Sequence, residues 1–270
     1  MSEIEYFKDV IKDKSANTIK SYVTQYKKLY KLLNKNIADT TQNDIMEIVM
    51  NVANANSRQA LLNIAIIIHT AKEMDVSRFL KYRETLKKEI KELQKQNNIV
   101  YKETLPTYDE LVDYTQNLIG KNNLFFVINY LLLNYYVRNE DLLFHIVTRK
   151  KDTEDESKNY LHLSKGKVIY IRNVYKTAKL YGRKENEIND KDFVVAVSKL
   201  KREDFEPLEM TQMPYLIKKA TLLGIGEGSY VKIVINHFRN DIDKLKEISK
   251  YRGTSLNTLL ESYDIDNKDL

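Results

Sequence analysis

The chain has 270 residues, of which 43% are hydrophobic, enough for one large domain or two smaller ones. It has no cysteine, which excludes disulfides, thiolate zinc sites and cysteine nucleophiles. Lysine and arginine outnumber the acidic residues by 44 to 38, and the net charge of +6 favours an anionic partner such as nucleic acid. The first residues, MSEIEYFKDV, predict no secretory signal, so we expect a soluble, intracellular protein that acts at DNA.

The N-terminal part is predicted to form four helices. With only 7 Gly and 3 Pro, the chain has few residues that break helices. Apolar residues at helical spacing predict a first helix that Ser15 or Asn17 caps. Three further helices are expected after Thr41, Ser57 and Ser77.

Lysines form the polar face of the first predicted helix. They are Lys20, Lys27, Lys28 and Lys31. Such a face serves either solubility alone or contact with DNA phosphates, and the residues by themselves favour neither.

A domain boundary is predicted at residues 96–106, where the helical periodicity breaks, so that domains of residues 1–97 and 105–270 result. Thr107 and Glu110 then match a capping box that opens a new helix. The apolar stretch 123–137 is too short to cross a bilayer and predicts a buried helix.

The second domain holds the strand-like segments. Residues 159–165 and 166–175 alternate apolar and polar side chains, as a hairpin would, and a third strand is expected within 187–198. After Pro207 the pattern is helical again, with a last helix that ends at Tyr263. The predicted fold class is therefore mainly α, with a small three-stranded antiparallel sheet in the second domain.

Familiar ligand motifs are weak in this chain. The four histidines are far apart in sequence and lack the spacing of metal ligands. The stretch GIGEG (224–228) resembles a phosphate loop, but no strand precedes it and no Gly-Lys-Ser/Thr follows. The end of one helix followed by a turn is the favoured interpretation.

Three basic residues lie beside predicted turns. Arg138 directly follows the apolar helix, Lys176 follows strand residues, and Arg239 lies near the end of an amphipathic helix. Each has a simple structural explanation: a partner for a helix dipole, a lysine at a hairpin tip, and a surface arginine.

Taken in chain order, these residues resemble the tyrosine recombinases, also called phage-type integrases. The stretch SANTIKSYVTQYKKLYKLL is similar to the opening helix of their core-binding domain. The stretch LLLNYYVRNEDLLFHI is similar to the motif of their first arginine, with Arg138 at the arginine and Asp141 at the acid. The catalytic lysine of the family falls on Lys176, with Lys179 as the second choice.

The C-terminal motifs of the family follow in order. NHFR resembles the second-arginine motif H-x-x-R, with Arg239 at the arginine, Asn236 at the histidine position and His237 displaced by one. YRGTSLNTLLESY resembles the final motif, with Tyr263 at the nucleophile and Thr254 where the family has histidine. The distance from the matched arginine to the tyrosine is shorter than is common in the family.

The resemblance implies a site-specific recombinase that cleaves and rejoins DNA through a covalent 3′-phosphotyrosine. Arg138 and Arg239 would clamp the phosphate, because a guanidinium donates two parallel hydrogen bonds and stays charged. Tyr263 would be the nucleophile and Lys176 the general acid. Auxiliary candidates are Asn236, His237, Thr254 and Lys179.

The implied partner is double-stranded DNA, bound by a homo-oligomer that is a tetramer in most of the family. The mechanism needs no metal and no cofactor. Two alternatives stay open: an enzyme like the type IB topoisomerases, and a DNA-binding protein with this fold that has lost catalysis.

Overall fold

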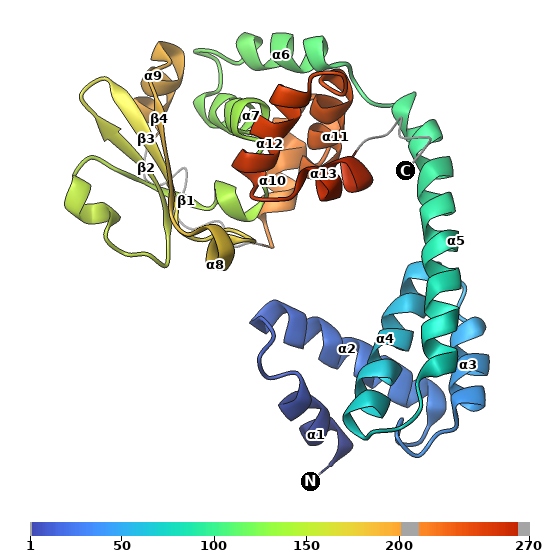
Figure 1. Cartoon of the computed structure of the whole chain (residues 1–270). Coiled ribbons are helices and arrows are strands. Elements are labelled where there is room, and N and C mark those ends of the chain that lie inside the picture. The colour runs from blue at the N-terminus through green and yellow to red at the C-terminus, as the bar shows by residue number, and fades with distance from the viewer. Residues whose placement is uncertain (1, 201–210, 264–270) are drawn as a thin grey trace. The chain divides into compact units, whose positions relative to one another are not determined.

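The structure is a computed structural model that describes residues 2–200 and 211–263. The chain divides into two compact units, residues 1–99 and 100–270 (Figure 1). The predicted helix start after Pro207 and the chain end beyond Tyr263 lie outside the described residues. None of the described helices is long and apolar enough to cross a membrane.

The first unit is helical. Its helices are α1 (Glu3–Val10), α2 (Ala16–Leu33), α3 (Gln42–Met50), α4 (Ala55–Ala71) and α5 (Ser77–Lys102), the last of which continues past the division. Helix α1, which Ser2 opens with a capping box to Glu5, is additional to the four helices predicted for this unit. Ser15 and Thr41 cap α2 and α3 as predicted, whereas α4 begins earlier than predicted, after its cap Asn54.

One apolar core holds the first unit together. Tyr26, Leu29 and Leu33 of α2 are buried in it together with side chains of the other helices. The opposite face of α2 is exposed and carries the predicted basic residues Lys20, Lys27, Lys28 and Lys31. Their contact with DNA stays a prediction.

The second unit packs helices against a small sheet. Its helices are α6 (Tyr108–Asn117), α7 (Asn123–Tyr135), α8 (Ala178–Tyr181), α9 (Lys191–Lys199), α10 (Met213–Ala220), α11 (Glu227–His237), α12 (Ile242–Arg252) and α13 (Leu256–Tyr263), and its short 3-10 helices are η1 (Glu140–Leu142), η2 (Lys150–Thr153) and η4 (Leu222–Gly224). The capping box of Thr107 and Glu110 opens α6 as predicted. Helix α7 contributes a nearly continuous run of buried side chains to the core, because both its sides are covered.

The sheet differs from the predicted three-stranded antiparallel one. It has four strands in the order β1 (Phe144–Val147), β2 (Asn159–Ser164), β3 (Lys167–Arg172) and β4 (Lys184–Ile188). The strand β1 pairs with β2 in parallel, and the other two pairs are antiparallel, so the sheet is mixed. The hairpin of β2 and β3 turns at Lys165 and Gly166 as predicted, both with positive φ.

The third predicted strand was wrong over most of its length. Only its first residues belong to β4, and the stretch from Lys191 onward is the helix α9. Asp190 caps that helix by accepting a hydrogen bond from the backbone N–H of Phe193. Phe193, Ala196 and Val197 are buried at helical spacing, so a helix face outweighs the β propensity of the valines.

The stretch GIGEG begins at the end of a helical turn, as predicted, but its last two residues already belong to α11, which was not predicted. Gly224 ends η4 with a φ of 66°, and Gly226 is the N-cap of α11. The first residue of that helix is Glu227, which enters the candidate site.

Candidate active site

The first arginine of the site follows directly after α7. Tyr136 ends that helix in the left-handed conformation, with a φ of 52°, at a cost of about 1–2 kcal/mol for a residue other than glycine. Its ring is buried, and its carbonyl points to the site. The backbone N–H of Arg138 donates to Oδ2 of the buried Asp141 at 3.0 Å, so the local turn aims the Arg138 side chain inward.

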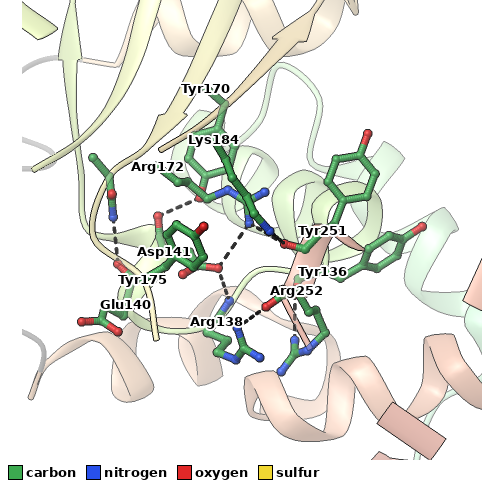
Figure 2. Close-up of polar contacts among 12 residues, drawn as sticks. Tyr136, Arg138, Glu140, Asp141, Tyr170, Arg172, Tyr175, Lys184, Tyr251 and Arg252 are labelled. Carbon is green, nitrogen blue, oxygen red and sulfur yellow. Dashed lines mark hydrogen bonds and ion pairs between the residues drawn. The ribbon is translucent and has the colours of Figure 1, made fainter. Parts of the chain in front are cut away.

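The structure places a different second arginine beside Arg138. Arg252, the last residue of α12, is only 1% exposed. Its carbonyl accepts a hydrogen bond from Nη1 of Arg138, and its own Nη1 donates to the carbonyl of Tyr136 at 2.7 Å. Figure 2 shows the two arginine side chains beside one another. Burial, and after it the charge of Arg252, lowers the pKa of Arg138.

The proposed nucleophile contacts this second arginine. Nη2 of Arg252 donates to the hydroxyl oxygen of Tyr263 at 3.0 Å and to Oε1 of Glu227 at 2.7 Å. The guanidinium carbon also lies 4.9 Å from the centre of the Tyr263 ring. One charged group therefore joins α13 to the start of α11.

One nitrogen atom of the Arg252 guanidinium, Nε, is left for a further contact. Nε and Nη2 form one edge of a guanidinium, which can hold both oxygens of an anion. Elsewhere in this protein, Arg149 uses this edge to hold both carboxylate oxygens of Asp152. In Arg252 the same edge holds Glu227 through Nη2 alone, and Nε is buried without a hydrogen-bond partner among the residues that the structure describes. A buried, unsatisfied donor on a cation favours a second anionic oxygen at this edge.

Arg239, the second arginine predicted from sequence, lies apart from this cluster, beyond the C-terminal end of α11. The helix ends at His237, and Arg239 is exposed just beyond its C-cap. Helix α11 rises about 1.5 Å per residue, so its C-terminal end is about 15 Å from Glu227 at its start. The hydrogen bonds that join the site run through Arg252, which holds Glu227 at the start of α11.

The predicted lysines flank the site in the connection from β3 to β4. Lys176 and Lys179 are both exposed there, the second of them on α8. The half-buried Lys184, at the start of β4, lies closer to the arginines: its Nζ donates to the carbonyls of Lys250 and Tyr251, at 2.7 and 3.3 Å.

The auxiliary candidates separate into two groups. Asn236 and His237 lie in the last turn of α11, and the His237 ring stacks on Tyr108 with the ring centres 4.2 Å apart. Thr254 follows Arg252 closely, in the turn between α12 and α13, where its carbonyl accepts a hydrogen bond from Ser249 Oγ. Of these candidates, Thr254 is the one that lies two residues after Arg252.

Comparisons with known proteins add a likeness in fold. No protein-family model matches the chain, and a search of curated proteins finds no match. Among solved structures, a crystal structure of XerA recombinase is similar at 14% identity and a TM-score of 0.37, over 98% of this chain and 93% of that chain. A likeness of this size carries no argument about the site, which rests on its own geometry.

A glycine lets the β3–β4 connection close onto the site. Gly253 caps α12 in the left-handed conformation, and its carbonyl accepts a hydrogen bond from Thr177 Oγ1 at 2.9 Å. A Cβ atom at this position would lie 2.5 Å from Thr177 Oγ1 and 3.3 Å from Lys184 Nζ. Only glycine fits both the backbone conformation and the space.

Substitution of Gly253 by alanine is expected to destabilise the protein by about 1 kcal/mol or more and to displace the β3–β4 connection. Thermal unfolding and amide hydrogen exchange of residues 173–183 measure the two effects. Gly120→Ala is the matched control, because Gly120 also has a positive φ but has nothing within 4 Å of an added Cβ. Equal exchange in both variants would refute the contact.

Sequence analysis did not predict four polar residues of this region. Arg252 and Glu227 lie inside stretches noted for other residues, Arg172 lies inside a predicted strand, and Lys184 lies between two predicted strands. Arg252 directly precedes the glycine of the final motif, which was the available signal. Nothing in a single sequence indicates that Glu227 and Arg252 meet. The described residues hold no group of three or more His, Asp or Glu side chains that could hold a metal ion.

Proposed function

We propose that this chain is a DNA strand transferase of the tyrosine-recombinase type, which cleaves and rejoins DNA through a covalent 3′-phosphotyrosine. The observation that carries the proposal is the convergence of Arg138, Arg252 and Tyr263, which come from three separate segments and are joined by hydrogen bonds. Two cations and one phenol hydroxyl suit the attack of a tyrosine on a phosphodiester.

The arginines supply the electrostatic part of this reaction. Attack on a phosphodiester places extra negative charge on the non-bridging oxygens, and fixed cations stabilise that charge without reorganisation. The edge of Arg252 with the unpaired Nε suits one phosphate oxygen, and the half-buried Arg138 beside it suits the other. Glu227 stays on the neighbouring Nη2 of the same guanidinium.

The bond changes follow from the position of the tyrosine. The Tyr263 oxygen forms a bond to phosphorus, and the bond from phosphorus to the 5′ oxygen breaks. The phenolic proton passes to the carboxylate of Glu227, which shares Nη2 of Arg252 with the hydroxyl. The leaving 5′ oxygen takes a proton from a lysine, and the reverse steps rejoin the strand.

Lys184 is the lysine that the contacts favour as this general acid, in place of Lys176. It lies on the strand β4, as the family resemblance implies. Its Nζ is 3.3 Å from the position that a Cβ atom would take at Gly253, the residue after Arg252. Burial first, and then the charge of Arg172, lowers its pKa to about 8. An acid with a pKa near the working pH transfers its proton most effectively.

The partner in this proposal is double-stranded DNA, and the assembly is a homo-oligomer. The four exposed lysines of α2 would add phosphate contacts, so binding should weaken as salt is raised.

The direct test is formation of a covalent adduct. The protein is incubated with a pool of nicked duplexes of randomised sequence, in which the cleaved strand diffuses away, and is analysed on a denaturing gel. A band of protein joined to DNA is expected. Relaxation of supercoiled DNA without paired sites would identify the topoisomerase alternative, and DNA binding without any adduct would identify a protein that has lost catalysis.

The general acid has a separate test. Lys184→Met is expected to slow cleavage by about 100-fold or more, because the 5′ oxygen is a poor leaving group unless protonated. A duplex with sulfur in place of the bridging 5′ oxygen needs no such proton, so it should restore the rate of this variant. Lys176→Met is the matched control. Rescue of Lys176→Met instead would return the role to the lysine predicted from sequence.

A further inference from the structure

A charged side chain lies buried at the centre of the second unit, next to the arginines of the site. Arg172 is the last residue of β3, and its exposed fraction is 0%. Burial of a charge is expensive unless the group is paired and hydrogen-bonded. The contacts of this guanidinium therefore need an explanation.

Arg172 links segments that carry different parts of the site. Its Nη1 lies 3.5 Å from Oδ2 of Asp141, the same oxygen that accepts from the backbone N–H of Arg138. Nη1 also donates to the carbonyl of Tyr251 at 3.1 Å, one residue before Arg252. Figure 2 shows the Arg172 side chain between these groups.

The same guanidinium faces the strand of the lysine. Arg172 pairs with Lys184 across β3 and β4, and its Nη2 donates to Asn186 Oδ1 at 3.3 Å. The carbonyl of Tyr251 accepts from both Arg172 and Lys184. A single buried group thus touches the segments that hold Arg138, Arg252 and Lys184.

Stability alone does not explain this arrangement. The ion pair of Arg172 and Asp141 is long, and within the described part of the chain two of its atoms, Arg172 Nε and Asp141 Oδ1, are buried without hydrogen-bond partners. Replacement of such a buried pair by apolar groups is often neutral or stabilising. An incompletely satisfied pair is more readily explained by the geometry it imposes on its neighbours.

We infer that Arg172 is a positioning residue for the strand-transfer site. It fixes the positions of Arg138, Arg252 and Lys184 relative to one another and does not touch the DNA. This inference rests on the proposed function above. Arg172 also acts on Lys184 through its charge, since the two residues are direct neighbours on paired strands.

The charges around Lys184 determine in which direction its pKa should change when Arg172 is replaced. After burial, the charge of Arg172 is the largest influence that lowers the pKa of Lys184; Arg138 and Lys250 act in the same direction, and Asp141 opposes them. The rings of Tyr175 and Tyr181 lie 5.1 and 5.3 Å from its Nζ. Removal of the Arg172 charge should therefore raise the pKa of Lys184 by about one unit.

The first experiment is an NMR titration of the lysine Cε–Hε signals in the free, full-length protein. The Lys184 signal, assigned by its loss in Lys184→Met, is expected to titrate at a higher pH in Arg172→Met than in the unaltered chain. Arg183→Met is the matched control, because Arg183 precedes Lys184 in sequence but its guanidinium faces Glu185 and the carbonyl of Thr153. An unchanged Lys184 titration in Arg172→Met would overturn the inference.

The second experiment measures single-turnover adduct formation against pH. The rate should fall by about 10- to 100-fold in Arg172→Met, because small displacements of catalytic groups have effects of this size. The loss of rate at high pH, where Lys184 has released its proton, should also move to higher pH. The negative charge of bound DNA should raise the pKa of Lys184 in every variant. The result is therefore the difference in pH dependence between Arg172→Met and the unaltered chain.

A conservative variant separates charge from geometry. Arg172→Lys keeps the charge but lacks the fork that reaches Asp141, Tyr251 and Asn186 together. In this variant the pKa of Lys184 should stay low, whereas adduct formation should still be slower than in the unaltered chain. A fall in rate with an unmoved pH profile in Arg172→Met would show a purely structural role, and failure of both variants to unfold cooperatively would make Arg172 a folding residue. Either result would overturn the inference.

The titration needs no DNA, so the two proposals fail separately. Absence of any adduct from the unaltered chain would contradict the proposed function. An unaltered titration of Lys184 would contradict the role of Arg172.

Discussion

Replacement of Tyr263 by phenylalanine is expected to abolish the covalent protein–DNA adduct while binding of duplex DNA persists. The change removes only the hydroxyl oxygen, which lies 3.0 Å from Nη2 of Arg252. Without that oxygen no bond to phosphorus forms, so the loss should be complete rather than partial. The measurement is the adduct band on a denaturing gel with the duplex selected from the randomised pool.

The matched control for this prediction is Tyr251→Phe. Tyr251 directly precedes Arg252, is half-buried and is the nearest tyrosine to it in sequence. This variant should retain the adduct. An adduct that survives in Tyr263→Phe would remove Tyr263 from its role, and proteolysis with mass spectrometry of the DNA-linked peptide would identify the residue that takes it.

Replacement of Arg252 is expected to have the second largest effect on adduct formation. Comparison with the same replacement of Arg239 shows which arginine acts in the reaction. Loss of one preorganised donor to a developing oxyanion lowers rates by about 100- to 1,000-fold. Arg252→Lys should approach this loss, because a lysine keeps the charge but cannot offer the Nε–Nη2 edge. Arg239→Lys should change the rate of adduct formation little, since Arg239 is exposed beyond the end of α11.

Stability needs a control in this comparison, because Arg252 is buried against Glu227. An unpaired charge left inside a protein is destabilising, so thermal unfolding of each variant is measured first. The pair Arg252→Gln with Glu227→Gln removes both charges and should restore the unfolding temperature but not the adduct. Loss of the adduct in Arg239→Lys, with activity retained in Arg252→Lys, would return the role to the arginine that the sequence motif indicates.

Local signals in the sequence predicted most helices of the second unit. The capping box of Thr107 and Glu110, and the apolar run of α7, involve residues close together in the chain. The sheet was harder to predict because pairing joins distant segments. The short strand β1 lies parallel to β2, and no local pattern in four residues indicates a parallel neighbour.

The site shows the same division between local and distant information. Arg138 and Tyr263 stand in stretches that resemble family motifs, and both lie in the cluster that the structure forms. Arg239 also stands in such a stretch, but it lies beyond the end of α11, and its role stays a prediction. Arg252 was overlooked because a charged residue beside a glycine usually marks an exposed helix end, whereas here the Tyr136 carbonyl, Glu227 and Tyr263 cover it.

The sequence by itself determined that the chain is basic, mainly helical and free of cysteine, and that Arg138 and Tyr263 are candidates for phosphate chemistry. Only the tertiary structure decided which arginine accompanies them. Gly253 takes a left-handed conformation and turns the chain between α12 and α13, so the hydroxyl of Tyr263 meets Arg252, 11 residues earlier. Such a meeting depends on the direction in which two helices pack, and the spacing of residues along one chain does not contain that direction.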